Sequence, residues 1–334
     1  MNEKIKAKII GIGSYLPEKV LSNFDLEKMV DTSDEWIVTR TGIKERRISE
    51  KDEYTSDMAF MAAKRALENA KILPEDIDVI ICATLTPDYI FPSTSCILQN
   101  KLEAVNSAAM DVQAACTGFI YGLSIAKAYI ESGQYKNILV VASEKLSSII
   151  DYEDRSTCVL FGDGAAACVV GLKGDNALDI ESVDIGADGA CSDLLMLPGG
   201  GCRNPASYET VDKKMHFIQM SGNEVFKHAV RRMISSTKTA LKKADLEESD
   251  ITWLIPHQAN LRIIEAIAKR FSRVDPQKVI QEGIKKYGNT SASSVCIVLD
   301  ELCKSGKLNK GDNILLTAFG SGFTWGSTVL SKRD

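Results

Sequence analysis

The sequence contains no run of apolar residues that approaches 18, and its strongest apolar segments, such as 137–142, are only strand-length. We therefore expect no membrane-spanning helix. The first residues lead into a β-like segment at 9–13 without the apolar stretch of a signal peptide, so the cytoplasm is the expected location. Gly and Pro are infrequent, at 23 and 8 of 334 residues, and 45% of residues are hydrophobic. This composition excludes collagen-like and low-complexity disordered chains.

Basic residues do not outnumber acidic ones, because 40 Lys and Arg stand against 45 Asp and Glu, for a formal net charge of −5. This balance argues against a chain built to coat nucleic acid or an anionic membrane, although a local basic patch stays possible. The nine cysteines are odd in number, and no two have Cys-x-x-Cys spacing. We expect neither a disulfide framework nor a structural zinc site, and we interpret most cysteines as reduced core residues.

The chain carries signs of an internal duplication, and its length alone predicts about two domains. Segment 66–81 resembles segment 240–255 at an offset of 174, and segment 131–140 resembles segment 304–316 at offsets of 173 to 176. Each copy has the pattern of a helix, an apolar strand, a second helix closed by Ser-Gly, and another apolar strand. The shared order of the matches favours duplication over chance.

Apolar strands that alternate with helices predict an α/β protein with a mixed or parallel sheet and helices on both faces. We place the boundary in the polar stretch 173–176, which gives an N-terminal half of residues 1–174 and a C-terminal half of residues 175–334. Two such halves would be related by a pseudo-twofold axis.

Cys116 stands out among the cysteines because it directly precedes a helical pattern from Ile120 to Ile130. A helix N-terminus stabilises an anion, so we expect a more accessible thiolate there and a more nucleophilic sulfur. The small neighbours Ala114, Ala115 and Gly118 would let a ligand approach.

The repeat offset connects Cys116 with two polar residues of the second half. At an offset of 173, Cys116 corresponds to Asn289. At an offset of 174, Ala83, which ends an apolar strand, corresponds to His257. The three side chains should therefore meet at one edge of the sheets, where ligands collect in α/β folds. Taken singly, His257 could be a structural histidine and Asn289 a turn or cap residue.

A cysteine, a histidine and an asparagine in this order fit two classes of enzyme. Papain-like hydrolases use the same order, and the separation of Cys116 from His257 lies within their usual spacing of about 130 to 150 residues. However, their Cys-Gly-[Ser/Ala]-Cys-aromatic motif is absent, and Cys116 lies in mid-chain. The hydrolase interpretation is therefore the weaker one.

Five strings of residues, in order along the chain, carry a resemblance to a known family: 111–119, 161–165, 256–262, 288–293 and 319–327. Together they resemble the β-ketoacyl-acyl carrier protein synthase III branch of the thiolase-fold condensing enzymes over nearly the whole chain. The resemblance implies a thiolase-like α/β fold whose two duplicated halves are layered α-β-α-β-α. It also implies a reaction without a metal or redox cofactor, in which an acyl-CoA primer condenses with malonyl-acyl carrier protein.

The resemblance implies a role for each member of the triad. Cys116 would take the acyl group, here from acetyl-CoA or another short acyl-CoA, and release CoA. Malonyl-acyl carrier protein would then lose carbon dioxide, and His257 and Asn289 would stabilise the enolate by hydrogen bonds. The elongating synthases and the thiolases carry a second His where Asn289 stands. The oxyanion hole would consist of the backbone N–H groups of Cys116 and Ser321, and many family members have Gly at the latter position.

The resemblance also assigns residues that bind the substrates and partners. For CoA and its pantetheine arm they are Thr32, Trp36, Arg40, Arg155, Lys227 and Asn260. Arg262, Lys269 and Arg270 share one helical face at i, i+7 and i+8, and this stripe could receive the acidic carrier protein, although a solvated face is the common alternative. Phe91 resembles the residue that reaches the partner's acyl pocket, which implies a homodimer.

Two other functions stay open from the sequence. One is a related acyltransferase or condensing enzyme of a specialised pathway on the same scaffold. The other is a binding protein that keeps an unused site, and the intact triad argues against it. The local motifs do not define the depth of the acyl pocket, on which primer length and branching depend.

Overall fold

The computed structural model describes residues 5–333. Within this range, one mixed sheet has nine strands in the order β11-β12-β13-β8-β1-β7-β6-β4-β5. The strands of the first half are β1 (Lys8–Tyr15), β4 (Val79–Ala83), β5 (Ala108–Val112), β6 (Ile138–Glu144) and β7 (Gly164–Gly171). Those of the second half are β8 (Leu178–Ala187), β11 (Trp253–Pro256), β12 (Asn313–Gly320) and β13 (Thr324–Lys332).

The two halves repeat one pairing pattern. In the first half, β4 is parallel to β6, and β7 is antiparallel to both β6 and β1. In the second half, β11 is parallel to β12, and β13 is antiparallel to both β12 and β8. The strand β5 has as its counterpart a single bridge between Leu254 and Val279. The halves join where β1 pairs with β8, with Lys8 opposite Asp179.

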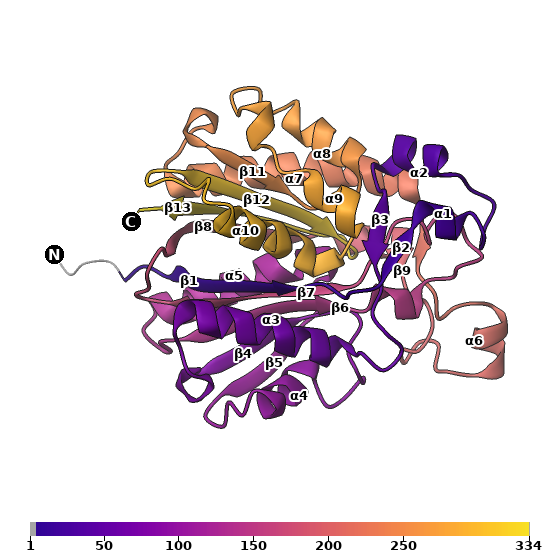
Figure 1. Cartoon of the computed structure of the whole chain (residues 1–334), viewed down its shortest axis with the longest axis horizontal. Helices are drawn as coiled ribbons and strands as arrows, with labels where there is room; N and C mark the ends of the chain where they lie inside the picture. The colour runs from indigo at the N-terminus through magenta and orange to yellow at the C-terminus, as the bar shows by residue number, and fades with distance from the viewer. Residues whose placement is uncertain (1–4, 334) are drawn as a thin grey trace.

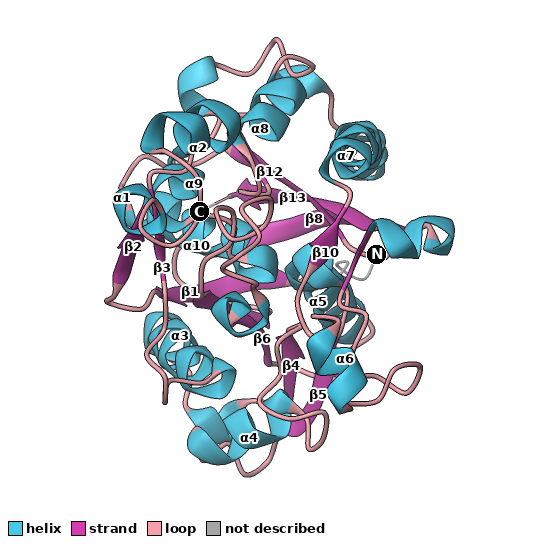
Figure 2. Cartoon of the chain, turned by 90° about the vertical axis from the view of Figure 1, so that its right-hand side faces the viewer, coloured by secondary structure: helices cyan, strands magenta, loops and turns pink. Residues whose placement is uncertain are grey.

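Helices form three layers around the two half-sheets (Figures 1 and 2). The helices α3 (Thr55–Ala70) and α4 (Thr94–Lys101) lie on the outer side of the first half, and α7 (Gly222–Ala244) and α8 (Leu261–Ala268) lie on that of the second. The helices α5 (Gly118–Glu131) and α10 (Ser294–Lys304) lie between the half-sheets. The layering is therefore α-β-α-β-α, as expected.

The alternation of side chains along each strand explains these layers. On β4, Val79 and Ile81 belong to the central cluster with α5 and α10, whereas Ile80 and Cys82 pack in the outer cluster with α3. The second half does the same, with side chains of β11 and β12 divided between the central cluster and a cluster with α7 and α8. Strands buried on both faces have continuous apolar runs, which is how the sequence indicated them.

The β1 strand lies unusually close to α3. A Cβ atom on Gly13 would lie 2.6 Å from the backbone nitrogen of Ala66, and one on Gly11 would lie 2.5 Å from that of Ala70. The contact face of α3 consists mainly of alanines, which permits this approach.

The remaining elements are short helices and strands that belong to the connections between the strands of the main sheet. They are β2 (Val20–Ser22), α1 (Asn23–Leu26), α2 (Asp34–Thr41), β3 (Glu45–Arg47), β9 (Leu195–Met196), α6 (Tyr208–Asp212), β10 (Gln219–Met220) and α9 (Glu282–Tyr287). Short 3-10 turns cover 74–76, 115–117, 146–149, 189–194, 248–250, 276–278 and 291–293. The α6 helix projects from the body of the molecule (Figure 1). Between residues 5 and 333, no helix has both the length and the apolar character needed to cross a membrane.

The predicted division at residue 174 falls in the loop between β7, which ends at Gly171, and β8, which begins at Leu178. The two halves share one continuous sheet, so the domain boundary stays a prediction. The outermost residues of the two predicted halves, 1–4 and 334, lie outside the described residues.

The interpretation of the cysteines needs one correction. All nine cysteines are free, and Cys82, Cys116, Cys158, Cys168 and Cys296 are buried. Cys191 and Cys303 are half-buried, but Cys96 and Cys202 are exposed and are therefore not core residues. Cys96 lies in α4, a helix with one outward face, and Cys202 lies in a glycine-rich loop.

Candidate active site

A cavity of about 1320 Å³ lies where several strands of both halves end. Cys116 from the first half lines it together with His257, Asn289 and Ser321 from the second. Each of these residues lies in or near a loop that follows a strand or leads into a helix. The structure thus brings the three predicted triad residues to one cavity.

Cys116 occupies a 3-10 turn that leads directly into α5. The preceding Ala115 has a φ of 46°, a left-handed conformation that costs a residue with a side chain about 1 kcal/mol or more. The thiol is 8% exposed, and burial raises its pKa to about 12. Burial thus opposes the stabilisation of a thiolate that we expected from the helix N-terminus, and that expectation stays a prediction.

His257 follows β11 and is held in a defined orientation. Its backbone N–H donates to the Thr317 carbonyl at 2.8 Å, and its Nδ1 lies 2.6 Å from the Ser294 hydroxyl. The Gln258 N–H donates to the same hydroxyl oxygen at 3.4 Å, so the Ser294 proton is free to be donated to Nδ1. When the Ser294 hydroxyl donates to Nδ1, the imidazole proton lies on Nε2. Burial lowers the pKa of His257 to about 3, so the ring is neutral.

Asn289 follows Gly288, whose φ of 65° lies in the region that glycine favours. The Asn289 side-chain oxygen accepts the Ser291 N–H at 2.9 Å. Its amide nitrogen therefore remains as a donor. Both second-half members of the triad thus have an N–H group to offer to a negatively charged oxygen.

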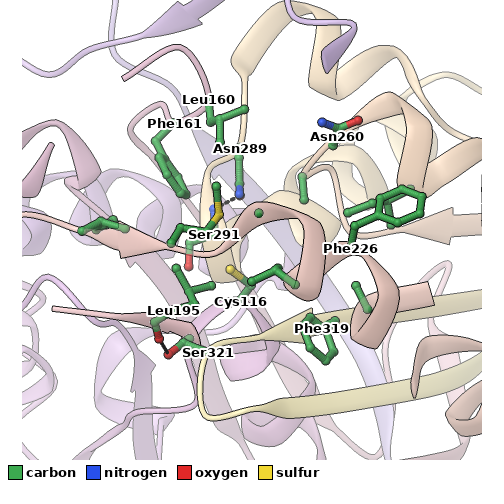
Figure 3. Close-up of a pocket in the computed structure, with 18 of the residues that line it drawn as sticks. Cys116, Leu160, Phe161, Leu195, Phe226, Asn260, Asn289, Ser291, Phe319 and Ser321 are labelled. Carbon is green, nitrogen blue, oxygen red and sulfur yellow. Dashed lines mark hydrogen bonds between the residues drawn. The ribbon is translucent and has the colours of Figure 1, made fainter. Parts of the chain in front are cut away.

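The turn between β12 and β13 closes against the nucleophile. A Cβ atom on Gly320 would lie 2.7 Å from the Cys116 backbone nitrogen, so only glycine fits at this point. The neighbouring Ser321 donates its hydroxyl to the Leu195 carbonyl. Figure 3 shows Cys116 between this turn and the turn that carries Asn289 and Ser291. This hydrogen bond ties the turn to β9.

Aromatic and basic side chains form another part of the cavity wall. Ser33 caps α2 by accepting the Trp36 N–H at 3.1 Å, which fixes the first turn of that helix. The guanidinium carbons of Arg40 and Arg155 lie 4.6 and 5.2 Å from the centre of the Trp36 ring. An indole with two cations suits an anionic ligand that carries a flat ring.

Two other predicted pantetheine contacts line the cavity as well. Asn260 caps α8 by accepting the Arg262 N–H at 2.9 Å, and its amide donates to the Arg40 carbonyl at 3.2 Å. Lys227 is exposed on α7 and forms a 2.7 Å ion pair with Glu224. Thr32 does not line the cavity, and its hydroxyl oxygen is buried without a hydrogen-bond partner.

The predicted basic stripe borders a second, shallower hollow of about 620 Å³. Arg262 lines both hollows, and Lys269 and Arg270 line the second. The structure differs from the expected single helix, because α8 ends at Ala268 and Arg270 lies beyond its cap. Phe91 lies outside both hollows and is 84% exposed, next to Ile90, which is equally exposed.

Three polar residues at the site were missed by the sequence analysis. Ser291 donates its hydroxyl to the buried Glu144 at 3.1 Å, and Ser294 contacts His257. A signal for Glu144 was present, because an acidic residue ends an otherwise apolar strand. The serines gave no such signal, since a Ser-rich helix start is common. Among residues 5–333, no cluster of His, Cys, Asp or Glu side chains has the makings of a metal site.

Comparison with known proteins gives consistent matches. The family model for 3-oxoacyl-[acyl-carrier-protein] synthase III matches residues 110–189, which include Cys116. The model for the C-terminal part of the same family matches residues 241–332, which include His257 and Asn289.

Individual relatives match over nearly their full length. Beta-ketoacyl-[acyl-carrier-protein] synthase III of Chlamydia caviae is 58% identical over 98% of both chains. The protein of the same name from Caldanaerobacter subterraneus is 56% identical over 99% of both. The crystal structure of 3-oxoacyl-[acyl-carrier-protein] synthase III from Aquifex aeolicus matches with a TM-score of 0.89 and 50% identity, over 97% of this chain and 99% of that one.

Proposed function

Because the chain belongs to the 3-oxoacyl-[acyl-carrier-protein] synthase III family, we infer that its cavity carries out the condensation that initiates fatty acid synthesis. The protein is an acyltransferase that joins an acyl-CoA primer to malonyl-acyl carrier protein and releases CoA and carbon dioxide. The alternative of a specialised pathway is not favoured, since the two curated relatives described above carry the name of the initiating enzyme. The observation that carries the inference is the meeting of Cys116, His257 and Asn289 in one cavity.

In the first step, Cys116 attacks the thioester carbonyl of the primer, and CoA leaves. We propose acetyl-CoA or another short acyl-CoA as the primer. The oxyanion of this step would accept hydrogen bonds from the backbone N–H groups of Cys116 and Ser321. The close approach of the β12–β13 turn to the Cys116 backbone supports this assignment.

In the second step, malonyl-acyl carrier protein loses carbon dioxide, and the resulting carbanion attacks the acyl-Cys116 carbonyl. The bond from that carbon to the Cys116 sulfur then breaks, and the released thiolate takes up one proton from solvent. Negative charge develops on the enolate oxygen before the new bond forms. His257 would donate its Nε2–H to that oxygen, and Asn289 would donate its amide N–H. Hydrogen bonds occupy the His257 Nδ1 and the Asn289 carbonyl. They support these roles because the His257 Nε2–H and the Asn289 amide N–H remain available to donate. The chemistry needs only thioesters and side chains, so we propose no metal or organic cofactor.

The substrate and partner contacts are proposals of the same kind. Trp36, Arg40 and Arg155, which line the cavity, would hold the nucleotide end of CoA together with Thr32, which does not line it. Lys227 and Asn260 would contact the pantetheine arm. Arg262, Lys269 and Arg270 would bind the acidic carrier protein beside the cavity. Phe91 would enter the acyl pocket of a second copy in a homodimer. A cytoplasmic location stays a prediction.

A direct test incubates the protein with acyl-CoAs of increasing length and then adds malonyl-acyl carrier protein. We expect a thioester adduct on Cys116, located by peptide mass spectrometry, followed by a β-ketoacyl product. Cys116→Ala should form neither, whereas Cys191→Ala, which removes a half-buried free cysteine, should form both. Adducts that only hydrolyse, or condensation by Cys116→Ala at a normal rate, would refute the proposed function. The longest chain that still forms an adduct measures the acyl pocket.

A further inference from the structure

Glu144 is a fully buried carboxylate beside the nucleophile, and the reaction steps above leave it without a role. It is the last residue of β6, and its exposed fraction is 0%. A charge costs free energy when it is buried, unless hydrogen bonds or an opposite charge compensate it. The nearest cation in sequence, the Lys145 ammonium, points instead to the carbonyls of residues 50, 51 and 53.

The hydrogen bonds to Glu144 are divided unequally between its two oxygens. Oε2 accepts three, from the Leu85 N–H at 3.0 Å, the Thr86 hydroxyl at 2.9 Å and the Thr84 hydroxyl at 3.2 Å. Oε1 accepts one, from the Ser291 hydroxyl at 3.1 Å. Oε1 is therefore the oxygen with room for a proton, and a proton there would face Ser291.

The 3-10 turns that carry Cys116 and Ser291 pack against each other, and both residues line the cavity. The Ser291 φ of 51° is unusual for a residue with a side chain, and Ser291 follows Asn289 in the turn that faces Cys116. Hydrogen bonding from Ser291 lowers the pKa of Cys116, whereas the charge of Glu144 raises it. The same hydroxyl group donates a hydrogen bond to Glu144 Oε1.

The proton affinities decide which group near Cys116 can take its proton. Burial raises the pKa of Glu144 to about 7, although its four hydrogen bonds oppose the shift. Burial lowers the pKa of His257 to about 3. The Glu144 carboxylate is therefore the stronger base of the two.

Other titratable groups face Glu144 from the elements around it. They are the Cys82 thiol on β4, on which Asp88 and Asp111 also act, and Asp163, next to the Gly164 that pairs with Glu144. The carboxylates of Asp111 and Asp163 accept their own hydrogen bonds, from residues 94 and 95 and from residues 49 and 147. Ser291 is hydrogen-bonded to Glu144 and lies in a turn that packs against the turn of Cys116, so Cys116 is the thiol that the carboxylate can serve.

We propose that Ser291 and Glu144 form the relay that removes the proton from Cys116 during acyl transfer, a role that rests on the proposed function. The Cys116 S–H bond breaks as its proton passes to the Ser291 oxygen, and the Ser291 hydroxyl proton passes to Glu144 Oε1. The electron pair on sulfur forms the bond to the acyl carbonyl carbon. When the bond from that carbon to the CoA sulfur breaks, the relay runs in reverse and protonates the departing thiolate. Glu144 is ionised again at the end.

The test separates the two half-reactions in Glu144→Gln. Acyl transfer to Cys116, followed as CoA release in a single turnover, should slow by about 100-fold or more, the usual contribution of a positioned base. In the wild type its rate should rise with pH to a plateau above about 7, as Glu144 ionises, and this rise should be absent from the variant. Condensation by enzyme acylated in advance and freed of CoA should proceed at the wild-type rate, because Glu144 ends acyl transfer ionised and has no proton to give to the Cys116 thiolate that condensation releases.

The controls separate a relay from a structural role. Asp163→Asn neutralises another buried carboxyl group at the same end of the sheet and should leave the pH profile unchanged. Ser291→Ala should slow acyl transfer as Glu144→Gln does, and the double variant should be no slower than either single one, because both members serve one path.

Each result decides the proposal. Wild-type acyl transfer and a wild-type pH profile in Glu144→Gln would overturn it, and so would equal slowing of both half-reactions or additive losses in the double variant. If Glu144→Gln does not fold, Thr86→Val is measured instead. This substitution removes one hydrogen-bond donor to Glu144, so the rise of the acyl-transfer rate with pH should shift to higher pH. A rise at the wild-type pH would overturn the relay. A wild-type protein that forms no acyl adduct would refute the proposed function itself.

Discussion

At the scale of single residues, the site depends on hydrogen bonds that decide which atom of a side chain faces the cavity. The Ser294 hydroxyl is hydrogen-bonded to the His257 Nδ1, and the Asn289 side-chain oxygen accepts the Ser291 N–H. An imidazole and a carboxamide each have one accepting and one donating side. Without these contacts, half of their orientations would present a lone pair to a developing negative charge.

Ser294→Ala should therefore impair the second half-reaction selectively. Loss of the buried partner of Nδ1 lets the ring adopt the wrong tautomer, and we expect about a 10-fold slower condensation, in line with the cost of one unmade buried hydrogen bond. Acyl transfer to Cys116 should change little. The matched control is Ser293→Ala, because the Ser293 hydroxyl is equally buried but donates to the Thr290 carbonyl. Equal slowing of both half-reactions, or by both variants, would contradict this role.

His257 should also make the folded protein less stable in acid. Its pKa is lowered from 6.5 to about 3 in the folded protein, so below pH 6.5 the unfolded chain takes up a proton that the folded chain does not. The free energy of unfolding should therefore fall as the pH drops from 6.5 towards 3, by up to about 1.4 kcal/mol for each pH unit from this group. Denaturant unfolding at pH 7 and pH 5 measures it.

In His257→Gln this part of the pH dependence should be missing. Glu144 acts with the opposite sign, because its raised pKa favours the folded state at low pH, but it is present in both proteins and cancels in the comparison. Identical slopes in the two proteins would show that His257 is accessible to protons in the folded state.

At the scale of elements, the α8 helix connects the cavity to the outer surface. Its cap Asn260 contacts the α2 helix, and Arg262 lines both the cavity and the basic hollow. Such a position suits a residue that guides a carrier protein while its pantetheine arm enters.

Arg262→Glu should raise the KM for malonyl-acyl carrier protein by about 10-fold or more, since a charge reversal replaces attraction by repulsion. The dependence of this KM on salt concentration should become weaker. The KM for acyl-CoA should change less, and kcat should stay near normal. Arg273→Glu makes the same change at an exposed site outside the hollow and serves as the control. An equal effect of both variants would mean that net charge, not this surface, guides the carrier protein.

At the scale of the whole molecule, the duplication was the most predictable feature. The repeat offset placed Asn289 opposite Cys116 and His257 opposite Ala83, and the pairings of β4 with β6 and of β11 with β12 follow the same plan. Periodicity is a local property, so it can be read from the chain. The raised pKa of Cys116 and the contacts of Glu144 could not, because both depend on burial by residues far away in sequence, such as Ser291 and the Gly320 turn.

Phe91 offers a test of assembly. It is 84% exposed beside Ile90, a costly arrangement in water that a second copy would relieve. We expect a dimer by light scattering for the wild type and a shift towards monomer for Phe91→Asp. Tyr208→Asp, at a residue that is 95% exposed on α6, should leave the dimer intact. A wild-type monomer at micromolar concentration would refute the proposed homodimer.

The strand order has a consequence for how the enzyme matures on the ribosome. β12 and β13 are translated after β8 and β11, yet they lie between those two strands in the sheet. A nascent chain that stops after β11 therefore has a gap in its second half-sheet and lacks the turn that closes over Cys116. The sulfur nucleophile is synthesised early and gains its surroundings late, so a chain that stops after β11 carries Cys116 without its triad partners His257 and Asn289.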